Sequence, residues 1–117
     1  MDWFGKINIC PKLKEKKGAK TMFTHIVFFK LADPTPINIQ KAKNILMGME
    51  GQIPQLKYLE VGVDILHTER SYDLVLITKF ECKNDMDAYQ VHPYHVNEVL
   101  ANLKPMLKGS AAVDYEA

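Results

Sequence analysis

The feature that most constrains the fold is a stretch of alternating residues, Phe23 to Leu31, in which both faces are mostly apolar. One face carries His25, Val27, Phe29 and Leu31, and the other carries Thr24, Ile26, Phe28 and Lys30. Such a stretch, rich in β-branched and aromatic residues, is typical of a central strand that is covered on both sides. The fold therefore needs strands beside this segment and a layer against each of its faces.

The rest of the chain supplies partners for this strand. Thr35 as N-cap and Pro36 at the first helical position predict a helix that closes at Gly51 and Pro54. After it we expect strands at 57–66 and 72–80 joined by a polar turn, helices at 84–90 and 93–104, and a last strand at 110–115. The order β-α-β-β-α-β predicts an α+β fold, the ferredoxin-like sandwich with two helices on one face of an antiparallel sheet.

Helices can cover only one face of this sheet. On the other face, Ile26, Phe28, Val75 and Ile77 make full exposure to water unfavourable. The economical solution is a second copy of the chain packed face to face, so we expect a homodimer.

Composition fits one water-soluble domain, with 47% hydrophobic and 25% charged residues in 117. We place that domain at 22–117 and a basic extension at 1–21. Residues 1–20 hold six lysines against two acidic residues, a net charge of +4, which leaves −3 for the rest. An acidic body argues against nucleic acid as a partner. The extension either contacts an anionic membrane or a partner, or is a plain flexible tail.

The chain has two cysteines, Cys10 and Cys82, too few for a disulfide framework, and a reducing cytoplasmic location is the expectation. It has no signal-peptide pattern and no run of 18 apolar residues, which predicts no transmembrane segment. Cys82 has no activating residue that the sequence can place beside it, so we interpret it as an ordinary thiol. Phosphate-binding glycine loops and Ser-His-Asp patterns are absent, and no cofactor is expected.

The segment Tyr89 to Val96 is the strongest candidate for a functional site, because it places Tyr89, His92 and His95 at a helix start. Histidine has an ordinary pKa of about 6.5 and changes charge near neutrality, so the segment suits proton transfer. A metal site is the alternative, with a third ligand from Glu98 or Asp87, but the pattern gives no complete ligand set and no metal is expected.

Four segments together resemble one family. They are Phe23–Lys30, Tyr72–Leu76, the pattern Tyr89-x-x-His92-Pro93-x-His95-Val96, and Val113–Tyr115. They resemble the stress-responsive dimeric alpha/beta-barrel family over about residues 22–117. The resemblance implies ferredoxin-like protomers that pair through their sheets into a dimeric α/β barrel.

Polyketide cyclases in that family imply a chemistry for the matching positions. By resemblance, His95 is the general base and Tyr89 orients or polarises a carbonyl, so these two are the predicted catalytic residues. His25 and His92 match histidines of the pocket and are the predicted substrate-binding residues. The resemblance implies cofactor-independent proton transfer or cyclisation on a small hydrophobic carbonyl compound.

Each of these residues also has a structural interpretation. His92 precedes Pro93 and can cap the helix, while His95 can hydrogen-bond the backbone. Tyr89 and His25 can be core residues whose polar atoms find a partner. The alternative function is a non-catalytic stress-response or ligand-binding dimer.

Overall fold

The computed structural model describes residues 21–117, so the predicted extension at 1–21 lies outside the described residues except for Thr21. The strands are β1 (Phe23–Leu31), β2 (Tyr58–Val63), β3 (Leu74–Phe80) and β4 (Leu107–Glu116). They form one sheet in the order β2-β3-β1-β4, and each neighbouring pair is antiparallel. The helices are α1 (Pro36–Met47), α2 (Lys83–Gln90), a π-helix at Tyr94–Leu100, α3 (Ala101–Leu103) and a 3₁₀ turn at Lys104–Met106. The predicted ferredoxin-like α+β fold is confirmed.

β1 is a central strand, as its two apolar faces predict. It pairs with β3 on one side and β4 on the other. In this register His25 lies opposite Thr78 of β3 and Asp114 of β4. Residues opposite each other share a face of the sheet, so these three side chains point toward the same layer.

The helix α1 begins where the sequence predicts, with Thr35 as its N-cap. The Thr35 hydroxyl oxygen accepts a hydrogen bond from the backbone N–H of Asn38 at 3.2 Å, and Pro36 occupies the first turn. The helix ends at Met47, earlier than the predicted stop at Gly51. Met49 and Ile53, just beyond it, are nevertheless buried, because the following turns continue along the core.

The predicted helix at 93–104 is present, but its first part is wider than an α-helix. Residues Tyr94–Leu100 form a π-helix, and the N–H of Ala101 donates to the carbonyl of Val96, five residues back. The buried side chains are His95 and Val99 in this segment and Leu103 in α3. Val96, between the buried His95 and Val99, is 41% exposed.

The ends of two predicted strands also need correction. β2 stops at Val63, short of the predicted end at residue 66, and Ile65 is 83% exposed in the connection to β3. Beyond it, the Asp64 N–H still donates to the Asp73 carbonyl at 3.0 Å, and the Asp64 carboxylate accepts the N–H of His67, which has a positive φ of 54°. β4 is longer than predicted and runs from Leu107 to Glu116.

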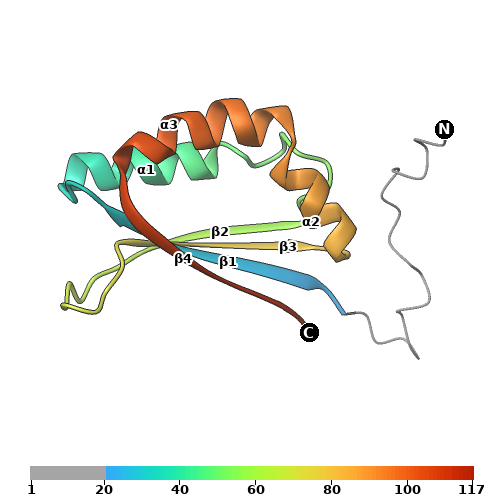
Figure 1. The fold of residues 1–117 in the computed structure, drawn as a ribbon, viewed down its shortest axis with the longest axis horizontal. Helices are drawn as coiled ribbons and strands as arrows, with labels where there is room; N and C mark the ends of the chain where they lie inside the picture. The colour runs from blue at the N-terminus through green and yellow to red at the C-terminus, as the bar shows by residue number, and fades with distance from the viewer. Residues whose placement is uncertain (1–20) are drawn as a thin grey trace.

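The helices all lie on one side of the sheet (Figure 1), and the buried core residues come from both layers. Phe80, Tyr89, Leu46 and Met49 are almost fully buried there. The opposite face has no helix over it, and we call it the open face. In the described part of the chain, no helix has the length and apolar character needed to cross a membrane.

Candidate functional site

Three of the four predicted site residues meet between the sheet and the helices. His25 comes from β1, Tyr89 from the last turn of α2, and His95 from the π-helix. The Tyr89 ring lies 4.5 Å from the His95 ring and 6.3 Å from the His25 ring, between centroids. The fold thus gathers residues that are up to seventy positions apart in sequence into one buried cluster, which we call the Tyr89 cluster.

Tyr89 is the centre of the cluster and is 1% exposed. Its ring also packs on Phe80, with 4.9 Å between centroids. Burial raises the pKa of the phenol well above its ordinary value, because the anion would lose its hydration. Tyr89 is therefore neutral at physiological pH. Among residues 21–117 we find no hydrogen-bond partner for its hydroxyl, which leaves the O–H available as a donor.

His95 is 6% exposed, and its orientation is fixed by the backbone. Its Nδ1 lies 3.0 Å from the carbonyl oxygen of Gln90. A carbonyl can only accept, so Nδ1 carries the proton and Nε2 has the free lone pair. Burial lowers the pKa of the imidazole below its ordinary value, and the nearby His25 and His92 lower it further, against the opposing effect of the Gln90 bond. The ring is thus a neutral proton acceptor at pH 7.

His25 is paired with a residue that the sequence did not single out. Its Nδ1 lies within hydrogen-bond distance of the Asp114 carboxylate, directly across from it on β4. The carboxylate fixes the His25 ring, with Nδ1–H as donor. In the sequence, Asp114 is only an acidic residue in a predicted strand. Its position beside His25 depends on the register between β1 and β4.

His92 lies outside the Tyr89 cluster, in the turn between α2 and the π-helix, where it is half-buried. Its Nδ1 accepts the backbone N–H of Tyr94 at 3.0 Å, and its carbonyl accepts the N–H of Val96. These bonds satisfy donors at the start of a helix that would otherwise lack partners. His92 therefore shapes the turn that holds His95 in position.

The Tyr89 cluster contains the groups needed for acid-base chemistry on a carbonyl compound. A neutral imidazole can accept a proton, and a neighbouring phenol can donate a hydrogen bond to an oxygen that becomes negative. Within residues 21–117, no three His, Cys, Asp or Glu side chains are grouped closely enough to bind a metal ion.

An antiparallel sheet of order β2-β3-β1-β4 with helices on one face defines a ferredoxin-like α+β protein, and the histidine-tyrosine cluster lies between its two layers. Comparison with protein families makes this more specific. The Stress responsive A/B Barrel Domain matches residues 23–117, and the chain belongs to that family. A search of curated proteins found no significant match.

Solved structures agree with this assignment. A dimeric ferredoxin-like protein of unknown function from Thermobifida fusca is 28% identical, with a TM-score of 0.73 over 84% of this chain and 92% of that one. A dimeric ferredoxin-like protein from Bacteroides fragilis is also 28% identical, with a TM-score of 0.70 over 82% and 96% of the two chains. The hydroxynitrile lyase from Passiflora edulis has a TM-score of 0.70 over 82% and 93%, but at 15% identity it shows only the shared fold.

Proposed function

We propose that the protein is a cytoplasmic homodimer that binds a small hydrophobic carbonyl compound and catalyses cofactor-independent proton transfer or cyclisation on it. The observation that supports this most is the geometry of the Tyr89 cluster, a neutral imidazole with a free Nε2 in ring contact with a phenol whose O–H has no partner among residues 21–117. The resemblance to polyketide cyclases of the same family supports the same assignment.

The proposed reaction is an aldol-type ring closure. His95 Nε2 removes a proton from a carbon next to a carbonyl, and the Tyr89 hydroxyl hydrogen-bonds the oxygen as it becomes an enolate. The enolate carbon then attacks a second carbonyl of the same molecule, and the resulting alkoxide takes the proton back from the imidazolium. His25, held by Asp114, and His92 are proposed to bind the substrate or to position His95.

Turnover without any added cofactor tests this proposal. We expect the purified protein to accelerate ring closure of linear β-keto thioesters with an apolar tail, measured as product formation above the buffer rate. The matched control is the same protein with both site residues changed, Tyr89→Phe and His95→Asn, which should return the rate to the buffer value. A parent protein no faster than this double variant contradicts the catalytic proposal.

The homodimer is supported by the dimeric neighbours and by the open face itself. The side chains of Ile26, Phe28, Val75 and Ile77 lie on it and are half-buried in the single chain. Beside them, Val113 is 53% exposed and lies opposite Ile26 in the register of β1 and β4. A contiguous apolar surface of this kind is expected to pack against a second copy.

A charge placed on the open face should separate the two protomers. Ile77→Asp is expected to turn a dimer into a folded monomer, because an unpaired carboxylate in an apolar interface loses its hydration. Light scattering at micromolar concentration gives the mass, and circular dichroism reports folding. The control is Ile37→Asp, since Ile37 is 73% exposed on the helix layer. A monomeric parent, or an Ile77→Asp variant that stays dimeric, contradicts the proposed interface.

The second candidate function is a non-catalytic stress-response or ligand-binding dimer with structural histidines. The observation that favours it is the tight packing of the Tyr89 cluster, with Tyr89 at 1%, His95 at 6% and His25 at 8% exposure. In this alternative, the ring contacts and the His95–Gln90 bond serve to fasten the helices to the sheet. The turnover experiment distinguishes the two functions.

A further inference from the structure

Cys82 lies at the junction between β3 and α2, where it is the N-cap residue of α2. It is 5% exposed, and it forms a disulfide bond. No cysteine among residues 21–117 is free. The interpretation of Cys82 as an ordinary thiol is therefore wrong. The sequence contains one other cysteine, Cys10, which lies outside the described residues.

The N-terminal extension enters the described fold beside Cys82. Phe23, the first residue of β1, is paired with Phe80 of β3, and Cys82 follows Phe80 by two residues. Neighbouring strands are about 5 Å apart and a strand advances about 3.3 Å per residue, so Cys82 is on the order of 10 Å from Phe23. Residues 11–22 can span up to about 40 Å. A bond between Cys10 and Cys82 therefore requires no change in the described fold.

Acidic side chains lie near this disulfide. Glu81 precedes it in the chain and is exposed, and Asp85 is in the first turn of α2. Burial and the nearby Glu81 carboxylate raise the pKa of Asp85, against the opposing effect of Lys57. Glu116, the last residue of β4, lies opposite the start of β1 at the same end of the sheet. Residues 1–20 carry six lysines against two acidic residues, so the extension has the complementary charge.

We propose that a reversible disulfide between Cys10 and Cys82 fastens the basic extension to the acidic start of α2. Disulfides in a reducing compartment are usually transient, and many sense the redox state. In the oxidising step, one cysteine thiolate attacks glutathione disulfide and releases one glutathione, which leaves a mixed disulfide. The second cysteine thiolate then displaces the other glutathione. The two protein thiols lose two electrons and two protons, and glutathione disulfide is reduced to two thiols.

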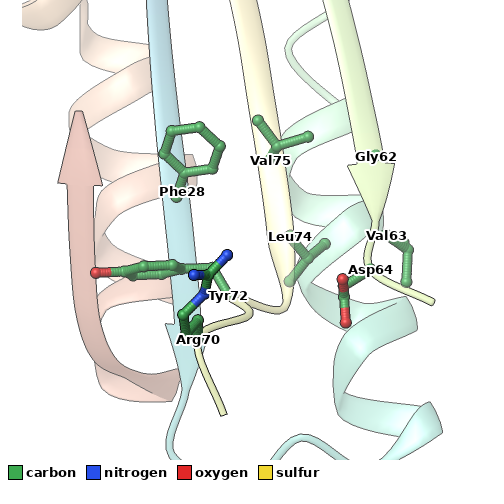
Figure 2. A pocket seen from close by; sticks show the side chains of 8 residues that line it. All are labelled: Phe28, Gly62, Val63, Asp64, Arg70, Tyr72, Leu74 and Val75. Atoms are coloured by element: carbon green, nitrogen blue, oxygen red, sulfur yellow. The ribbon is translucent and has the colours of Figure 1, made fainter. Parts of the chain in front are cut away.

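The docked extension lies away from the surface of the proposed dimer. The hollow lined by Phe28, Tyr72 and Val75 belongs to the open face, which the second copy covers in that dimer (Figure 2). α2 belongs to the helix layer on the other side of the sheet (Figure 1). The inference therefore requires neither the dimer nor catalysis at Tyr89. It gives α2, whose last turn carries Tyr89, a contact that depends on redox conditions.

The test uses the full-length protein, oxidised by glutathione disulfide and then treated with N-ethylmaleimide to block free thiols. Trypsin cleaves after lysine, so the proposed bond joins the peptide 7–12 to the peptide 80–83. We expect mass spectrometry to find this pair, lighter by two hydrogens than the two reduced peptides together, and to lose it after dithiothreitol. The α2 amides should exchange hydrogen more slowly in the oxidised protein. Cys10→Ser should exchange like the reduced parent in both conditions.

Charge variants test the docking separately from the bond. Glu81→Gln should shift the equilibrium with glutathione about two- to fivefold toward the reduced protein, the size of an exposed ion pair. Glu98→Gln is the matched control, because Glu98 is exposed on the π-helix, and it should leave the equilibrium unchanged.

Four results overturn the proposal. They are a peptide 80–83 linked to a second copy of itself, a Cys82 that the reagent still blocks after oxidation, equal exchange of α2 in the oxidised and reduced protein, and equal shifts in the two charge variants.

Discussion

Replacing His95 by asparagine is expected to lower the rate of ring closure by about 10²–10⁴-fold, the usual contribution of a general base. The amide nitrogen of asparagine can still donate to the Gln90 carbonyl, as His95 Nδ1 does at 3.0 Å, so the helix contact is retained. The proton acceptor at Nε2 is lost. The measurement is the initial rate at saturating substrate, with the unfolding midpoint recorded for the same preparation.

The contrast between asparagine and alanine at this position separates catalysis from structure. His95→Ala leaves the Gln90 carbonyl without its partner, and an unsatisfied buried acceptor costs about 1–3 kcal/mol. We therefore expect His95→Ala to lose both activity and stability, and His95→Asn to lose activity with a smaller change in stability. If His95→Asn turns over substrate like the parent, the general-base assignment is wrong.

The pH dependence gives a second readout of the same residue. Because the folded-state pKa of His95 lies below the unfolded value of about 6.5, the unfolded chain binds more protons in the window between the two. The stability that depends on neutral His95 is present above pH 6.5 and is lost as pH falls through the folded pKa. The rate should fall in the same direction, as the base becomes protonated. His95→Asn should reduce the slope of stability against pH below 6.5.

Much of the fold can be predicted from the sequence, because the patterns that indicate its strands and helices are local. The alternation of Phe23–Leu31, the Thr35-Pro36 helix start and the apolar spacing of Ala42 and Leu46 each indicate an element without knowledge of the rest. The π-helix at Tyr94–Leu100 cannot be predicted in this way. It follows the turn at His92, where the His92 ring bonds the N–H of Tyr94. The connection after β2 likewise contains the Asp64–His67 hydrogen bond, a contact between a side chain and a later backbone group that an apolar pattern does not indicate.

The candidate site could be predicted only in part from the sequence. Tyr89 and His95 are close in the chain, and their contact follows from the helix start between them. Asp114 was missed as a partner of His25, because two residues 89 positions apart meet only through strand register.

Replacing Tyr89 by alanine is expected to destabilise the protein by about 3–5 kcal/mol, the cost of removing a fully buried aromatic ring. Its ring is 1% exposed and touches Phe80, His95 and His25, so its loss leaves a cavity at the junction of α2, the π-helix and the sheet. That is a large share of a total stability of about 5–15 kcal/mol. Urea unfolding at one fixed protomer concentration measures it, since dimerisation makes stability concentration-dependent.

Tyr89→Phe is the matched control, because it keeps the ring and removes only the hydroxyl. The hydroxyl has no hydrogen-bond partner among residues 21–117, so its removal should leave stability nearly unchanged. If the hydroxyl stabilises an enolate, the same variant should lose about 10²–10³-fold in rate, as when an oxyanion donor is removed. Parent-like stability with a large loss of rate assigns the ring to packing and the hydroxyl to chemistry. Parent-like values of both would remove Tyr89 from the reaction and favour the structural role.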